Sequence, residues 1–274
     1  LAGGGIAIQD AVSVSIHNNT VAHNETTATA ALAFSTDPTK SNATPAGIVA
    51  REHSGDFFDL MSIATVPRGN PDLLDFSNPD LSDSIVEHNR SYYWLNYDDP
   101  ATTVIETGLY PANCLTAPTG CDLANVAGYS VDLAVLDGPF TAVDPAFLAI
   151  DPSYSLLTDN AENQANYIGV EGNVTGDPGF VNGYFNGGLG NLDITEFTTL
   201  STAGAFDEGG NFIQVAFSPL SLIDSATGAL LDYHVQAPSA AIDAGDPANS
   251  PGVDIDDDLR PQGGGFDIGA DEAQ

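Results

Sequence analysis

The sequence predicts an all-β chain, wound as a parallel β-solenoid with long loop excursions between its turns. Short apolar–polar alternations recur along the first part of the chain, and Gly, Asn or Asp separates each from the next. One strand-like element also occurs twice. A strand of this length cannot bury its apolar face alone, whereas stacked turns of chain hide their aliphatic side chains along one interior. A β-sandwich, whose strands are also short, is the alternative.

The opening segment predicts three short strands, at residues 6–8, 12–16 and 20–24. In each of them an apolar residue alternates with a small or polar one, which is the pattern of a half-buried strand. Asn residues at the corners suit a left-handed backbone, and their side-chain amides can form hydrogen bonds to the equivalent residue in the next turn of the solenoid. The side chains expected to line the interior are Ile6, Ile8, Val14, Ile16 and Val21.

The repeated element is residues 20–26, Thr-Val-Ala-His-Asn-Glu-Thr, which residues 85–91, Ile-Val-Glu-His-Asn-Arg-Ser, match in pattern. Their offset of 65 residues predicts three turns of about 22 residues each. At this spacing His23 and His88 are three turns apart and too distant to share a ligand, so a structural corner role is expected for both. Between the two copies, further short strands are expected at residues 47–50 and 57–61.

Composition divides the chain into three regions. Residues 1–95 carry the predicted rungs, residues 96–236 are a β-rich continuation with long loops, and residues 237–274 are rich in Asp, Gly and Pro. The strands predicted after residue 96 are residues 129–136, 167–170, 180–181, 212–217 and 230–235.

The chain is strongly acidic, with 38 Asp and Glu against 5 Lys and Arg and a formal net charge of −33. Nucleic acids and anionic lipids attract clustered basic side chains, so neither is an expected partner. A hydrophobic fraction of 42 % is enough for a substantial core. No apolar run approaches the ~18 residues that span a bilayer, so no membrane span is predicted. Any signal peptide is expected to have been removed or to lie upstream.

The tail contains three distinctive segments, residues 237–245 (APSAAIDAG), 254–261 (DIDDDLRP) and 266–272 (FDIGADE). Together with residues 176–181 (GDPGFV), they resemble bacterial secreted right-handed parallel β-helix proteins, often labelled choice-of-anchor Q domain proteins. The resemblance implies a right-handed parallel β-helix with an irregular C-terminal cap, in a secreted or surface-displayed protein that is often part of a longer chain. It implies no single activity, and Asp257 stands where the family commonly has Gly.

Cys114 and Cys121 are the only cysteines, and they bracket a short loop that Pro118 and Gly120 can turn. The pair predicts a local disulfide and an exported protein, with two free thiols as the alternative. No C-x-x-C-H motif occurs, so attached haem is not expected. The Gly-rich stretches lack the following helix and Lys of a phosphate-binding loop, so no nucleotide is expected.

Calcium is the metal that the sequence favours. Asp254, Asp256 and Asp258 alternate along the tail, and a turn can bring Asp267 near them. Hard cations are bound by several carboxylate and carbonyl oxygens at one point. The alternative is that these carboxylates cap turns and form ion pairs with Arg260.

Five Asn-x-Ser/Thr sequons are glycosylation candidates in an exported chain. They are at Asn18, Asn24, Asn42, Asn89 and Asn173.

The aromatic run of residues 92–94 is either a sugar-contact surface or core packing, and packing is favoured. A glycoside hydrolase needs two carboxylates across a cleft, and the candidate pairs are Asp80 with Asp83 and Asp98 with Asp99. The net charge of −33 repels an acidic polysaccharide.

The expected function is that of a non-catalytic extracellular or cell-surface module with a structural, adhesive or assembly role. No amphipathic segment at Leu1 covers the first turn, so upstream rungs, another protein or another copy are expected to cover it. The alternative is a polysaccharide lyase or hydrolase, or a polysaccharide-binding module.

Overall fold

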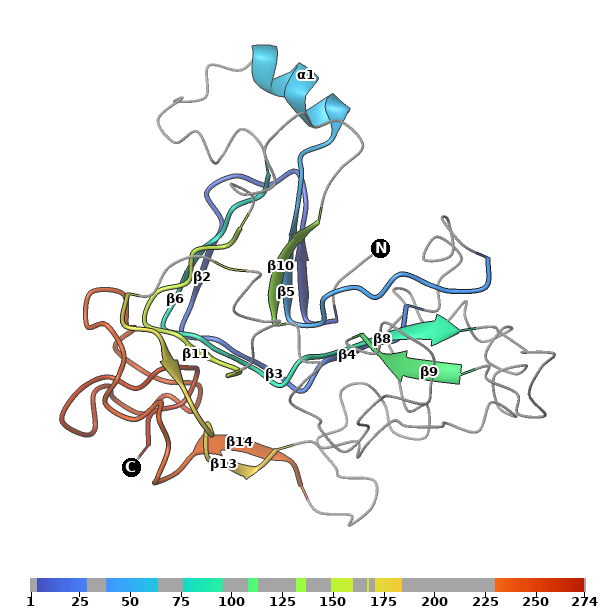
Figure 1. Ribbon diagram of the computed structural model, residues 1–274. Helices are drawn as coiled ribbons and strands as arrows, with labels where there is room; N and C mark the ends of the chain where they lie inside the picture. Colours follow the sequence, from blue (N-terminus) through green and yellow to red (C-terminus); the bar gives the residue numbers. More distant parts are fainter. Residues whose placement is uncertain are drawn as a thin grey trace, which may run out of the picture.

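The computed structural model describes residues 4–28, 38–63, 76–95, 108–112, 132–136, 149–159, 167, 171–183 and 230–273. Across these residues the fold is all-β with mainly parallel sheets, and a single helix, α1 (Gly55–Ile63), stands apart from the sheets (Figure 1). No helix in this part of the chain is long and apolar enough to cross a membrane.

The parallel sheets are built from strands that lie far apart in the sequence. The strands are β1 (Ile6–Ile8), β2 (Ser15–His17), β3 (Thr20–Ala22), β4 (Glu25–Thr26), β5 (Ile48–Arg51), β6 (Asp80–Ser82), β7 (Ile85–Glu87), β8 (Arg90–Leu95), β9 (Gly108–Pro111), β10 (Leu133–Leu136), β11 (Leu156–Leu157) and β12 (Val174–Thr175). The two larger parallel sheets have the orders β1-β5-β10 and β3-β7-β11-β12. In addition, β2 pairs with β6 and β4 with β8, both in parallel, while β9 pairs antiparallel with β8.

Two successive passes of the chain lie side by side, because β1, β2, β3 and β4 pair in the same order with β5, β6, β7 and β8. Val21 lies opposite Val86, which confirms that residues 20–26 and 85–91 are equivalent. The predicted spacing is wrong, since their offset is one step between neighbouring strands rather than three turns of about 22 residues. The intervening chain includes β5 and α1, and strand pairing does not fix the length of such an excursion.

The strand predicted at residues 57–61 is also wrong, because these residues lie in α1. The Ser54 Oγ accepts the Phe57 N–H at 3.2 Å, which is the geometry of a helix N-cap. Asp56 places a negative charge in the first turn, where the helix dipole favours it. A short apolar run is compatible with either a helix or a strand, and here the preceding cap decides for the helix.

Most other predicted strands are confirmed on the described residues. The two late strands, β13 (Phe180–Asn182) and β14 (Asp232–Val235), form an antiparallel pair. Tyr167 forms one parallel bridge with Ile150, while residues 168–170 and 212–217 lie outside the described residues. Within the ranges predicted at residues 6–8, 12–16, 20–24, 47–50, 129–136, 180–181 and 230–235, the strands occupy residues 6–8, 15–16, 20–22, 48–50, 133–136, 180–181 and 232–235, and residues 129–131 lie outside the described residues.

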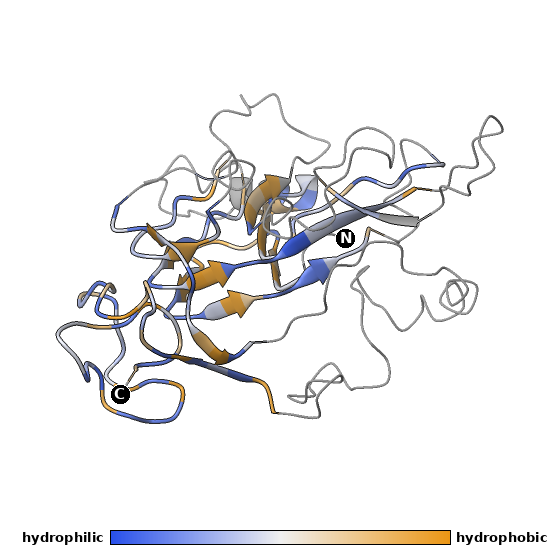
Figure 2. Ribbon diagram, turned by 60° about the horizontal axis from the view of Figure 1, so that its bottom comes forward, coloured by the Kyte–Doolittle hydropathy of each residue, from blue (hydrophilic) through white to orange (hydrophobic). Residues whose placement is uncertain are grey.

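One apolar cluster joins all the parallel sheets except the β4–β8 pair. Ile8, Ile16 and Val21 are buried in it, and Ile6 and Val14 pack against it, which confirms the predicted interior. Apolar segments of paired strands lie next to one another in Figure 2. Burial of this shared apolar surface therefore holds the sheets together. The later strands and the chain between them contribute Ile48, Ala50, Phe76, Leu81, Val86, Leu133, Ile150 and Leu157.

The C-terminal segment, residues 237–273, packs against the opposite side of the β3-β7-β11-β12 sheet. Successive side chains of a strand point to opposite faces. Val86 and Leu157 therefore belong to the first cluster, whereas Ile85 and Leu156 belong to a second one. The segment is irregular, as predicted, but it flanks several paired strands (Figure 1) and is not a cap across the end of the stack. The buried members of the second cluster are Ile85, Leu156, Val235, Ala241 and Ile268.

We expect Gly269→Ala to loosen this packing. Gly269 has φ +108°, and an added Cβ would lie 2.8 Å from the Ile85 Cδ1 and 3.2 Å from the Thr20 Oγ1. Backbone strain and overpacking together should lower the free energy of unfolding by about 1–3 kcal/mol, measured by urea denaturation. Gly252→Ala is the matched control, since nothing lies within 4 Å of its added Cβ. Equal stabilities of the two variants would contradict the close contact.

Candidate functional site

The corners before β3, β7, β11 and β12 share one backbone conformation. Asn18, Asp83 and Tyr154 have φ of 53°, 50° and 46°, and Gly172 has φ of 66°. These values lie in the left-handed region, which Gly, Asn and Asp enter most readily. The same turn is therefore repeated in each neighbouring layer.

A ladder of side chains follows these corners. The Asn19 N–H donates to the Ser84 Oγ at 3.2 Å, the Ser84 N–H to the Ser155 Oγ at 3.3 Å, and the Ser155 N–H to the Asn173 Oδ1 at 2.9 Å. The Ser84 Oγ donates in turn to the Ser82 carbonyl at 2.8 Å. Each side chain thus supplies an acceptor to a corner N–H of the next layer.

A second ladder follows the corners at His23 and His88, whose φ values are 57° and 51°. The Asn24 N–H and Nδ2 both donate to the Asn89 Oδ1, at 3.1 and 2.9 Å. The Asn89 N–H and Nδ2 donate to the Asp132 Oδ1, at 3.0 and 2.9 Å. The predicted hydrogen bond between the side-chain amides of equivalent Asn residues is therefore confirmed. Burial raises the pKa of the Asp132 carboxyl, and hydrogen bonds from Thr158 and Asn89 oppose that shift.

The second ladder bears on the predicted glycosylation sites. Asn89 is fully buried, so its amide is not accessible in the folded protein. The side-chain amides of Asn18, Asn24 and Asn173 donate hydrogen bonds within the chain, whereas Asn42 is exposed. Four of the five sequons thus supply structural asparagines, and Asn42 is the accessible position.

We expect Asn89→Ala to destabilise the protein strongly. The change removes the acceptor of the Asn24 N–H and Nδ2 groups and the Nδ2 donor to the buried Asp132 carboxylate, while the backbone N–H of residue 89 stays. Buried polar groups left without partners should cost about 2–4 kcal/mol of unfolding free energy, measured by chemical denaturation. Asn42→Ala, at the exposed sequon, is the control and should cost much less, because water can replace the partners of an exposed amide. A near-neutral Asn89→Ala would show that the ladder does not stabilise the fold.

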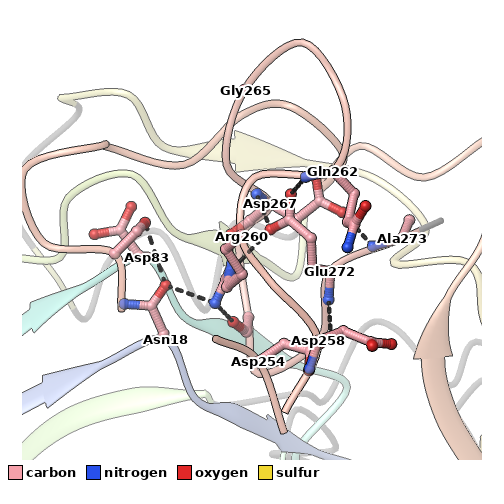
Figure 3. Close-up of polar contacts among 12 residues, drawn as sticks. Asn18, Asp83, Asp254, Asp258, Arg260, Gln262, Gly265, Asp267, Glu272 and Ala273 are labelled. Carbon is pink, nitrogen blue, oxygen red and sulfur yellow. Dashed lines mark hydrogen bonds and ion pairs between the residues drawn. The ribbon is translucent and has the colours of Figure 1, made fainter. Parts of the chain in front are cut away.

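Arg260 organises the C-terminal segment and ties it to a corner (Figure 3). Its Nε donates to the Glu272 Oε2 at 2.8 Å, and both side chains are fully buried. Its Nη1 donates to the Gly269 carbonyl and to the Asn18 Oδ1, each at 3.2 Å, and its Nη2 donates to the Asp267 carbonyl. The Arg260 guanidinium therefore joins residues 267–272 of the tail to the corner between β2 and β3.

The predicted calcium ligands Asp254, Asp256 and Asp258 form a turn. The Asp254 Oδ1 accepts the Asp256 and Asp258 N–H groups, each at 2.9 Å. Its Oδ2 accepts the Glu272 N–H at 3.3 Å. The Asp254 carboxylate therefore caps the backbone of its own turn, which is the alternative that the sequence left open.

Asp267, the fourth predicted ligand, also binds backbone. Its Oδ1 accepts the Asp243 N–H and its Oδ2 the Ala273 N–H, both at 2.7 Å. Burial raises the pKa of this carboxyl, while the two backbone hydrogen bonds oppose the shift. Among the described residues, no three of the predicted ligands offer atoms within 4.8 Å of one another. The geometry favours turn capping over a calcium site at Asp254, Asp256, Asp258 and Asp267.

Asp256 instead contacts His234 of β14, with Asp271 close by. The His234 Nδ1 also lies 2.5 Å from the Asp232 Oδ1. Hydrogen bonds to Asp256 and Asp232 raise the pKa of His234 to about 9. The Asp271 Oδ2 accepts the Val235 N–H at 2.7 Å. This cluster thus connects β14 to the tail, mostly at the surface.

We expect the contribution of His234 to stability to depend on pH. Its folded pKa of about 9 lies above the unfolded value of about 6.5. The stabilisation is therefore complete below pH ~6.5 and is lost as the pH rises through ~9. The urea midpoint of the native chain should exceed that of His234→Gln at pH 6, and the two should converge by pH 10. A difference that stays constant over this range would contradict the assignment.

The structure brings together His23 and His88, which the repeat spacing predicted to be three turns apart. The rings of His23 and His88 are stacked, with centroids 6.0 Å apart, because their corners belong to neighbouring layers. The His88 Nδ1 lies 2.5 Å from the Glu87 Oε1. One ligand atom from each of His23, Glu87 and His88 lies within 4.8 Å of the others. The repeated His-Asn dipeptide was the sequence signal for this cluster.

Burial and charge act differently on the three groups. Burial lowers the pKa of His23 to about 4, and the charges of His88 and Arg90 lower it further. Burial raises the pKa of Glu87. For His88, burial lowers the pKa, but the hydrogen bond to Glu87 and nearby carboxylates outweigh it, so its pKa is raised. His23 is thus a neutral imidazole beside an ion pair.

The structure describes some of the remaining predicted site residues, namely the aromatic run and the first carboxylate pair, but not the others. Residues 92–94 are buried in β8, so core packing is confirmed for the aromatic run. The Asp83 Oδ1 accepts the Asp246 N–H at 2.6 Å, and Asp80 contacts His17 at 3.2 Å. The predicted disulfide and the second carboxylate pair lie outside the described residues, at Cys114, Cys121, Asp98 and Asp99.

Comparisons with protein-family models, curated proteins and solved structures find no match to this chain. The resemblance of the tail segments to choice-of-anchor Q domain proteins stays a prediction.

Proposed function

We propose that this chain is a right-handed parallel β-helix that serves as a non-catalytic structural, adhesive or assembly module, outside the cell or at its surface. The strand order supports this winding, since β1 to β4 are followed in the same order by β5 to β8. A third pass continues the pattern in β10, in the parallel bridge of Ser153 to Ser82, and in β11. Three passes along the same sheets are what a solenoid requires.

The observation that carries the proposal is the pair of side-chain ladders at the corners. Their Asn, Ser and Asp side chains bond one layer to the next, and Ser84, Asn89 and Asp132 are fully buried. Buried polar networks that are fully bonded make a rigid and specific structure. These side chains are therefore used for cohesion between layers, as suits a structural module.

The edge of the stack supports an assembly role. In the described part of the chain, β1, β2, β3 and β4 each lie at one edge of their sheets. Edge strands are templates for pairing with further strands. The proposed partners are upstream rungs, another protein or another copy, and polysaccharide is a further proposed ligand of the surface.

Ala7→Pro tests the assembly role. The neighbouring Ile6 N–H donates to the Gly47 carbonyl at 2.9 Å, and the period of two directs the Ala7 N–H to the outer edge. Proline there removes an outward donor. The native chain should associate reversibly as concentration and salt rise, because salt screens its net charge of −33. Ala7→Pro should weaken this association, so that it requires at least a tenfold higher protein concentration in light scattering. Ala7→Val keeps the N–H and should associate like the native chain.

Two outcomes would contradict the proposed function. One is a chain that stays monomeric at high concentration and high salt and is unaffected by Ala7→Pro. The other is sustained release of reducing or unsaturated ends from a panel of neutral and acidic polysaccharides, which would favour the enzymatic alternative.

A further inference from the structure

The cluster formed by His23, Glu87 and His88 lies where two equivalent corners meet. Glu87 ends β7, and each histidine occupies a left-handed corner directly after β3 or β7. The pairing of β3 with β7 therefore fixes the imidazoles opposite each other, with centroids 6.0 Å apart and planes 28° apart. The cluster is thus positioned by the backbone of two layers rather than by a long loop.

Two polar side-chain atoms in this cluster are buried without a hydrogen-bond partner. They are the His23 Nδ1 and the Glu87 Oε2, and the Glu87 residue is only 2 % exposed. Buried polar atoms without partners are rare in folded proteins and require an explanation. The neighbouring corner groups do have partners, since the Asn24 and Asn89 N–H groups are bonded in the second ladder.

We propose that His23, Glu87 and His88 bind a divalent transition-metal ion of the zinc type. Two imidazole nitrogens and one carboxylate oxygen are a ligand set that zinc accepts. Calcium and magnesium prefer oxygen ligands throughout. The ion would occupy the position toward which the ligand atoms, all within 4.8 Å of one another, converge.

The surrounding charge favours a cation at this position. Glu87 is a buried acidic group, and the charges of Asp132 and Asp177 add to the negative potential at Glu87 and His88. In the absence of an ion, the His88 imidazolium can balance the Glu87 carboxylate. A divalent ion would balance the same charge and also use the His23 Nδ1, which the ion pair leaves without a partner.

The antiparallel pair of β13 and β14 holds the His23 ring in place. Phe180 packs edge-on against this ring with centroids 6.0 Å apart, and Tyr233 lies 6.1 Å away. A Cβ added to Gly183 would lie 3.0 Å from the His23 Cε1. Packing that restricts a ligand ring in this way preorganises a metal site. The metal would therefore join two layers of the stack next to the β13–β14 pair.

The second histidine cluster does not carry the same inference. His234 and Asp256 are exposed and already paired with each other, and Asp271 accepts the Val235 N–H. This difference makes His234→Ala a matched control. The metal proposal does not depend on the assembly role, because it uses only contacts within one chain.

Zinc binding to the full chain tests the proposal. After treatment with EDTA and dialysis, the native chain should take up one zinc ion at neutral pH in isothermal titration. Its cobalt complex should show the visible absorption of a low-symmetry site, and zinc should raise the melting temperature. Glu87→Gln and His23→Ala should each weaken zinc binding at least tenfold and abolish the cobalt spectrum. Calcium and magnesium should not compete.

His234→Ala should keep both the zinc stoichiometry and the cobalt spectrum. Circular dichroism of Glu87→Gln establishes that this nearly isosteric variant is folded, so that a loss of binding reports on the site. The proposal is wrong if the native chain binds no zinc. It is also wrong if Glu87→Gln binds zinc as the native chain does, or if His234→Ala alone removes the binding.

Discussion

The structure depends on how its corners satisfy backbone N–H groups. A chain that turns sharply between short parallel strands has N–H groups that point along the stack rather than into a continuous strand pairing. Here the acceptor is a side chain of the adjacent layer, as in the contacts from Asn24 to Asn89 and from Asn89 to Asp132. Since neighbouring layers are about 4.8 Å apart, only a short polar side chain at the equivalent position can make this bond. Strand register and corner chemistry therefore specify each other.

The same short strands explain why the tail is folded against the sheet. A two- or three-residue strand has alternating side chains on both faces, and β7 and β11 carry aliphatic residues on each. One face fills the shared core, so the other needs a cover, which Ala241 and Ile268 of the tail provide. The buried pair of Arg260 and Glu272 gives this irregular segment a defined shape. Removing either partner of such a buried pair would leave an uncompensated charge and destabilise the segment.

Sequence patterns of a few residues predicted the short strands and their corners, but they could not predict how many layers separate two repeated elements. Period-two alternation located β1, β2, β3 and β5, and Asn at the corners predicted the bond between Asn24 and Asn89. The layer count between residues 20–26 and 85–91 was wrong because excursion length is independent of strand register. The sequence could not choose between the two roles of the tail aspartates, because Asp254 carries the same sequence signal whether its carboxylate caps N–H groups or binds a cation.

Some corners hold residues that suit the left-handed backbone, whereas the two corners with histidine hold a side chain that makes further contacts. The corners before β3, β7 and β12 hold Asn18, Asp83 and Gly172, residue types that enter the left-handed region at little cost. The corners after β3 and β7 hold His23 and His88 in the same conformation. The backbone there would be satisfied equally well by Asn or Gly. The imidazoles reach beyond the corner, to each other, to Glu87 and to Phe180 of β13, so the reason for histidine at both positions lies in what the rings contact.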